Sequence, residues 1–113
     1  MQNVQGLNRK ISRRYYFIKF NLSKEDYLFL IRNSEKELSD SISDTNEQIN
    51  GNILFSVVDA GNLLGLISDA VFLYGMDDEY APTEIGKRLY HIYDEILYQK
   101  CQQEEKEKNN DSE

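Results

Sequence analysis

Cysteine, histidine and proline are almost absent from this chain, since each occurs once, at Cys101, His91 and Pro82. A single cysteine excludes an internal disulfide and is typical of a protein in a reducing compartment. Around a single histidine no Ser–His–Asp set or Cys–His pair is evident, so nucleophilic catalysis has no support. We therefore predict a cytoplasmic protein that is not an enzyme and uses no metal or other cofactor.

A long uninterrupted apolar run is also missing. The most apolar segment, residues 53–74, is broken by Asp59, Asn62 and Asp69. A membrane-spanning helix needs about 20 nearly uncharged residues, and carboxylates are costly in lipid. Residues 1–12 are polar, so we expect no signal peptide there. The sequence thus predicts a soluble protein without a membrane span.

Charge of one sign is absent from one long segment and scarce in the next. Residues 1–24 contain six Lys or Arg and no acid, whereas residues 25–85 contain thirteen Asp or Glu and only two bases. The net charge is −7. Such asymmetry favours a charged partner, or one end of the chain folding against another.

The apolar residues that are present predict one small α+β domain. They make up 40% of 113 residues, enough for a single core. Residues 13–22 alternate as a strand does, with Phe20 and Leu22 among the residues on its core face. Ser23 caps a helix that runs to about Ser39, and residues 39–47 form a polar loop. Asn50-Gly51 predicts a hairpin with a type I′ turn that joins residues 47–49 to residues 52–55.

Two further helices follow this hairpin. Ser56 is the predicted N-cap of the first, and Gly75 ends it. Thr83, after Pro82, caps the last helix. The apolar stripe of this helix, at spacings of three and four, is formed by Ile85, Leu89, Ile92, Tyr93 and Ile96. Residues 102–113 contain no apolar side chain. We therefore expect a flexible basic arm over residues 1–12, a single α+β domain over 13–101, and a disordered acidic tail over 102–113.

The acids of the two polar connectors predict a binding function. They would steer a cationic partner towards a rigid scaffold. This pattern fits a small interaction protein that binds and occludes a basic surface. Immunity proteins, antitoxins and inhibitors of nucleic-acid-handling enzymes act in this way. The simpler interpretation is an ordinary acidic surface without a partner. The predicted partner-binding residues are Asp40, Asp44, Glu47, Asp77, Asp78 and Glu79.

The basic N-terminal segment supports an alternative, a regulator that binds nucleic acid. Arginine neutralises phosphates and aromatic rings stack on unpaired bases. The same bases would otherwise pair with the acids of their own chain or protect a strand edge. The residues concerned are Arg9, Lys10, Arg13, Arg14, Tyr15 and Tyr16.

The central helix offers a third kind of contact. Gly61, Gly65 and Ser68 form a smooth strip where another helix could approach closely, and Leu66 and Phe72 lie off the main apolar stripe. This pattern predicts partner binding or a homodimer through the central helix.

The nucleic-acid alternative predicts retention on heparin at low salt. Replacing Arg9, Lys10, Arg13 and Arg14 by alanine removes that retention, because phosphate-like contacts depend on these cations. Elution in the void volume at low salt contradicts the alternative.

Overall fold

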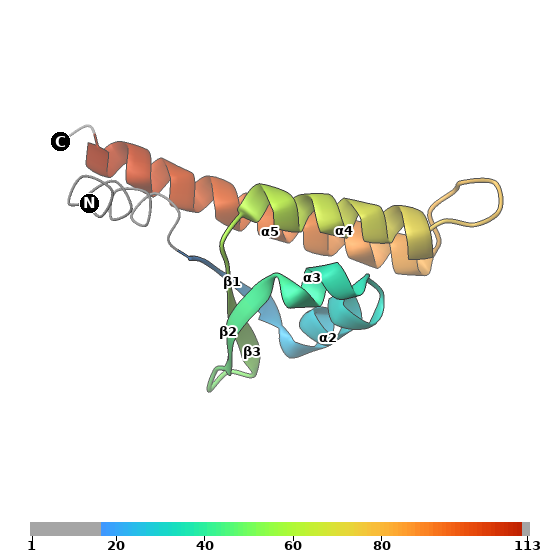
Figure 1. Cartoon of the computed structure of the whole chain (residues 1–113), viewed down its shortest axis with the longest axis horizontal. Helices are drawn as coiled ribbons and strands as arrows, with labels where there is room; N and C mark the ends of the chain where they lie inside the picture. The colour runs from blue at the N-terminus through green and yellow to red at the C-terminus, as the bar shows by residue number, and fades with distance from the viewer. Residues whose placement is uncertain (1–16, 112–113) are drawn as a thin grey trace, which may run out of the picture.

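The fold is organised around a three-stranded antiparallel sheet whose middle strand comes last in the sequence. The structure, a computed structural model, describes residues 17–111 and the side chains of residues 17–106. Strands β1 (Ile18–Ser23), β2 (Ile42–Glu47) and β3 (Asn52–Val57) lie in the order β1-β3-β2. Four helices accompany them in this part of the chain, so the fold class is α+β, as the sequence predicts (Figure 1).

Strand β1 confirms the predicted alternation where the two overlap. Phe20 and Leu22 are buried, whereas Lys19 on the opposite face is exposed and Asn21 between the two apolar residues is half-buried. The ring centroids of Phe20 and Phe55 of β3 are 5.9 Å apart. The first residues of the predicted strand, 13–16, lie outside the described residues.

The first predicted helix is divided into two. Helix α2 (Lys24–Arg32) begins as expected, with the Ser23 hydroxyl accepting a hydrogen bond from the Asp26 backbone N–H. It ends at Asn33, whose side-chain Nδ2 donates to the Phe29 carbonyl at 2.8 Å. Such side-chain bonds to the last turn compete with helix continuation. A second short helix, α3 (Lys36–Asp40), follows.

The predicted loop over residues 39–47 is wrong, because residues 42–47 form strand β2. Apart from Ile42, the residues of this strand are polar and most are exposed, so hydrophobic alternation does not reveal it. Pairing with the apolar strand β3 supplies the backbone hydrogen bonds instead. The register shifts between Ser43 and Asn46, and Asp44 at this irregularity has φ of 52°.

A hairpin around Asn50-Gly51 is confirmed, but its first strand is residues 42–47 instead of the predicted residues 47–49, and its turn is not type I′. Gly51 has φ of 87°, whereas Asn50 does not have a positive φ. The Gly51 N–H donates to the Gln48 carbonyl at 2.9 Å, and the Gln48 N–H donates to the Asn52 carbonyl at 2.7 Å. This is the longer hairpin loop in which one glycine adopts the left-handed conformation.

Helix α4 (Ala60–Tyr74) starts later than predicted. Its N-cap is Asp59, whose carboxylate accepts from the Asn62 N–H at 3.0 Å. Ser56, the predicted cap, is buried in β3 because its backbone pairs with both neighbouring strands. The predicted stop at Gly75 is confirmed.

Helix α5 (Glu84–Asp111) carries the predicted Thr83 cap and continues beyond the predicted end of the domain. Leu89, Ile92 and Ile96 of its stripe are fully buried. Residues 102–111, expected in a disordered tail, are its last turns, and residues 112–113 lie outside the described residues. Glu, Gln and Lys favour helix, and an ion pair between Lys100 and Glu104 supports the start of this stretch.

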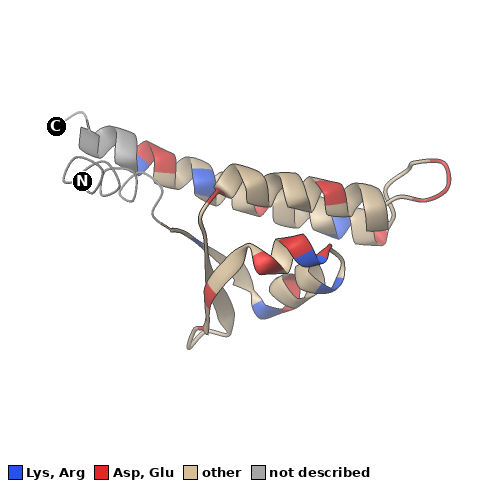
Figure 2. Cartoon of the chain, in the orientation of Figure 1, with Lys and Arg blue, Asp and Glu red and all other residues tan. Residues whose placement is uncertain are grey.

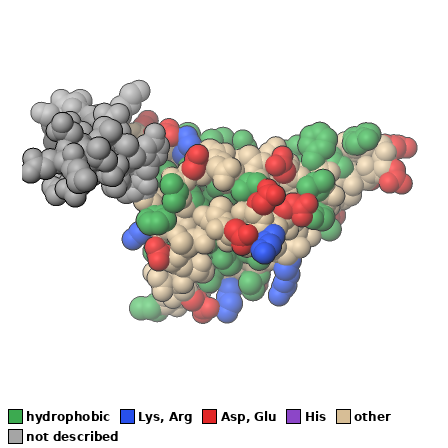
Figure 3. Space-filling model, in the orientation of Figure 1, with side chains coloured by type: hydrophobic (Ala, Val, Ile, Leu, Met, Phe, Trp, Pro, Cys, Tyr) green, Lys and Arg blue, Asp and Glu red, His purple; other side chains and the backbone are tan. Residues whose placement is uncertain are grey.

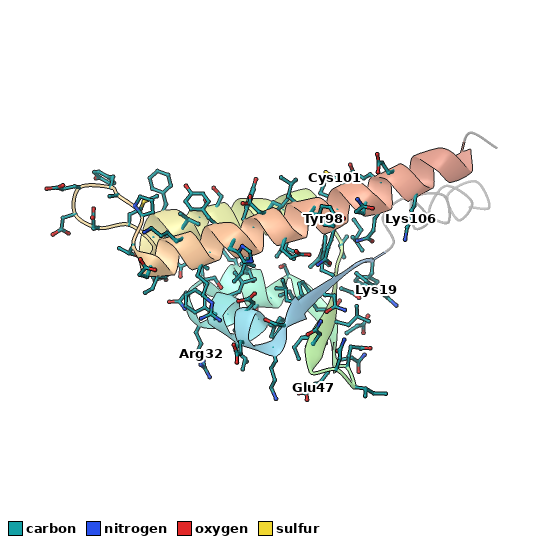
Figure 4. All side chains as sticks on the ribbon, turned by 180° about the vertical axis from the view of Figure 1, so that it is seen from behind. Lys19, Arg32, Glu47, Tyr98, Cys101 and Lys106 are labelled. Atoms are coloured by element: carbon teal, nitrogen blue, oxygen red, sulfur yellow. The ribbon has the colours of Figure 1, made fainter. Side chains whose placement is uncertain are left out.

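Helices α4 and α5 pack side by side, and the sheet with α2 and α3 lies on one side of this pair (Figures 1 and 4). All seven elements share one hydrophobic core. Its largest fully buried side chains include Phe20, Leu30, Leu38, Phe55, Leu63, Ile67, Leu89, Ile92 and Ile96.

Two glycines allow α4 to turn into α5. A Cβ on Gly75 would lie 2.5 Å from the Cα of Gly86, and a Cβ on Gly86 would overlap the Gly75 carbonyl. That carbonyl also accepts hydrogen bonds from the Thr83 N–H at 2.9 Å and the Thr83 hydroxyl at 3.1 Å. The backbones therefore meet with no room for a side chain between them.

Substitution of Gly86 by alanine should destabilise the protein by about 1–3 kcal/mol, because a methyl group here displaces backbone atoms. The matched control is Gly65→Ala in α4, where an added Cβ meets nothing within 4 Å. This control should be stabilised by up to about 1 kcal/mol. Urea unfolding of both variants measures the difference, and equal stability of the two contradicts the close backbone contact.

Candidate interaction surface

The predicted acids on loop 77–81 lie at the end of the α4–α5 pair, well away from β2 (Figure 2). Asp77 holds the loop in shape, because its Oδ1 accepts from the N–H groups of Glu79 at 2.8 Å and Ala81 at 2.9 Å. Asp78 and Glu79 are exposed. Tyr80 beside them is 77% exposed and has φ of 61°. The loop therefore displays two carboxylates and an aromatic ring, while Asp77 has a structural role.

The other three predicted acids lie on α3 and β2. Asp40 is the last residue of α3, and Asp44 occupies the irregularity in β2; both are exposed. Glu47 ends β2 and its carboxylate lies 2.9 Å from the ammonium of Lys24. The six predicted residues thus belong to two separate surfaces and do not form one site.

A groove between α3 and α4 brings acids and apolar side chains together. Its hollow has a volume of about 330 Å³. We call it the acidic groove. It is lined by Glu35, Glu37 and Leu38 on the α3 side and by Leu66, Asp69, Phe72 and Leu73 on the α4 side.

The acidic groove has carboxylates on both sides of an apolar centre. Glu35, Glu37 and Asp69 are exposed, and Figure 3 shows acidic side chains gathered over α3 and the neighbouring part of α4. Phe72 and Leu73 are 69% and 58% exposed. Large apolar side chains left open to solvent beside charged groups are typical of a binding surface.

A hydrogen bond connects the acidic groove to the end of α4. The Tyr74 hydroxyl donates to Oε2 of Glu35 at 2.9 Å. This bond raises the pKa of Tyr74 above its usual value, because ionisation would remove the donated proton and place two negative charges together. Glu35, which precedes α3, is thereby held against α4.

Sequence reasoning did not select Glu35, Glu37 or Asp69. The spacing of Leu66, Asp69 and Leu73 places them on one side of a helix, and this pattern was a usable signal. No sequence pattern indicated that α3 lies against that side of α4, because the contact depends on the division of the first predicted helix.

A second hollow, of about 670 Å³, lies around Arg88 on the surface formed by α2 and α5. The Arg88 guanidinium lies 4.3 Å from the ring centroid of Phe29, and its Nε donates to Asp26 at 3.2 Å. His91 also lines this hollow, and acids and bases are mixed along it. The Arg88 contacts join α2 to α5 and give the hollow no preference for one sign of charge.

The residues of the nucleic-acid alternative lie outside the described part of the chain; they are Arg9, Lys10, Arg13, Arg14, Tyr15 and Tyr16. Gly61, Gly65 and Ser68 are exposed on α4, and the homodimer stays a prediction.

Among the side chains that the structure describes, no three of His, Cys, Asp or Glu converge as metal ligands. No helix in this part of the chain is long and apolar enough to span a bilayer.

Comparison with family models, with curated proteins and with solved structures finds no match.

The Tyr74–Glu35 bond predicts a pH dependence. Because the folded-state pKa of Tyr74 is raised, the stabilisation is complete below the unfolded value of about 10 and is lost as pH rises through the higher folded value. The difference in unfolding free energy between wild type and Tyr74→Phe should therefore be constant from neutral pH to about pH 10 and shrink above it. Denaturant unfolding across this range measures it, and Glu35→Ala should abolish the pH-dependent part.

Proposed function

We propose that this protein is a small non-enzymatic interaction protein that binds and occludes a basic surface of a partner macromolecule. Its mode of action is that of an immunity protein, an antitoxin or an inhibitor of a nucleic-acid-handling enzyme. The observation that carries the proposal is the acidic groove, in which three exposed carboxylates surround exposed apolar side chains.

The two kinds of side chain in the groove have different roles in binding. Carboxylates on a protein of net charge −7 attract a cationic surface and raise the association rate. Apolar side chains become desolvated in the complex and slow its dissociation. A surface with both properties suits tight occlusion better than a surface with charge alone.

Predicted acids outside the groove add negative charge elsewhere on the molecule. Asp40, Asp44, Asp78 and Glu79 are exposed. They add to the long-range field that steers the partner, whereas Asp77 and Glu47 are engaged within the chain. We place the protein in the cytosol, where the free thiol of Cys101 stays reduced.

A paired substitution tests the role of the groove. The variant Glu37→Gln/Asp69→Asn removes two groove charges and spares Glu35, which bonds Tyr74. The control Asp94→Asn/Glu105→Gln removes the same two residue types from exposed positions on α5. Immobilised protein should capture a basic partner from native lysate, and the groove variant should weaken capture about tenfold, equivalent to about 1.4 kcal/mol.

Salt provides the second readout of the same experiment. Capture by wild type and by the control should fall together as ionic strength rises, because exposed charges are screened. A partner that is held equally at high salt, or equally by the groove variant, contradicts the proposal. Capture of an acidic partner contradicts it as well.

A further inference from the structure

We infer that the acidic groove receives an amphipathic helix of the partner, with apolar side chains over Leu66 and Leu73 and with Lys or Arg on both flanks. This inference rests on the proposed function and names the form of the partner segment. It follows from three properties of the groove, which are its backbone, its charge and its size.

The backbone of the groove walls favours a helix over an extended segment. Every lining residue belongs to α3 or α4, apart from Glu35 at the start of α3. Helical backbone makes its hydrogen bonds internally, so these walls do not present a strand edge to an incoming chain. An extended segment covering the apolar centre would bury its own N–H and C=O groups without partners, which is costly. A helix satisfies these groups within itself.

The distribution of charge determines which side chains that helix carries beside its apolar face. Glu37 stands on the α3 wall, and Asp69 stands on the α4 wall between Leu66 and Leu73. A helix entering between them therefore meets a carboxylate on either side of an apolar stripe. Bases on both flanks of its own apolar face make this arrangement favourable, whereas acids there are repelled.

The size of the hollow excludes full enclosure of a ligand. A volume of about 330 Å³ is at the lower end of the range for small-molecule pockets, and the large exposure of Phe72 and Leu73 leaves the groove open on one side. Such a space accepts a few apolar side chains from a helix that lies along the surface. The groove is therefore expected to select a partner by the pattern of its apolar side chains as well as by its charge.

Selection from a phage-displayed library of random dodecapeptides against the full chain tests this inference. The enriched peptides should carry apolar residues at helical spacing, flanked by Lys or Arg. A synthetic copy of the best peptide should gain helical circular dichroism on binding. Its affinity should fall at least tenfold with Leu73→Gln and with Glu37→Gln/Asp69→Asn.

Two variants serve as matched controls. Leu97→Gln changes an exposed leucine on α5, and Asp94→Asn/Glu105→Gln changes two exposed acids on the same helix. Both should bind the peptide as wild type does. Since Leu73 is 58% exposed, its substitution is not expected to disturb the core, and the unfolding transition of each variant verifies this.

Each other outcome overturns the inference. If the enriched peptides are basic but have no apolar pattern, and if Leu73→Gln binds them as wild type does, the inferred helix is contradicted while the proposed function is retained. Enrichment of acidic peptides contradicts both proposals. If no peptide is enriched, or if the peptide binds without gaining helical circular dichroism, the inference of a helical partner segment is contradicted. Stronger peptide binding after Arg9, Lys10, Arg13 and Arg14 are replaced by alanine would assign the groove to the chain's own N-terminal segment. If the protein forms a concentration-dependent dimer that no longer binds the peptide, the groove is the contact surface for a second copy of the chain.

Discussion

The contact between Gly75 and Gly86 is the constraint on which the rest of the structure depends. It sets the distance between α4 and α5 where the chain reverses, and Thr83 closes the same place by two hydrogen bonds to the Gly75 carbonyl. Because the two backbones meet there, the apolar stripes of both helices can pack against each other and against the sheet. Loop 77–81 is held at the end of this pair by Asp77.

The acidic groove is a consequence of the same arrangement combined with a break in the chain. Asn33 ends α2 and lets α3 take a separate direction, with Leu38 in the core and Glu37 exposed. Helix α4 is already positioned by α5, so α3 packs along the part of α4 that α5 leaves open. Leu66, Asp69 and Leu73 then face the acids of α3 across the hollow. The packing of α3 on α4 thus places charged and apolar side chains in one groove.

The last helix, α5, forms hydrogen bonds to the free edge of strand β1. The Gln99 side chain accepts from the Asn21 N–H at 2.9 Å and donates to the Asn21 carbonyl at 2.7 Å. Gln103 donates to the Lys19 carbonyl at 2.9 Å. Strand β1 has a neighbour on one side only, and these amides satisfy backbone groups on its other side. Residues 99 and 103 thus tie α5 to the sheet.

Features that depend on neighbours in sequence were predicted well. The Ser23 and Thr83 caps, the stop at Gly75, the buried face of β1 and the stripe of α5 each rest on a few consecutive residues. Features that depend on distant partners were missed. Strand β2 forms because β3 pairs with it, and Ser56 is buried between two strands, so it cannot cap α4.

The same division applies to the candidate surface. Composition and local pattern by themselves determined an acidic α+β protein and placed Asp78 and Glu79 on an exposed loop. Only the tertiary structure decided that Glu47 pairs with Lys24, and that Glu35, Glu37 and Asp69 share a groove with Phe72 and Leu73. The physical reason is that helix and turn preferences act over three or four residues. The groove, by contrast, joins segments about thirty residues apart, and their contact is set by the packing of α3 and α4 on a common core.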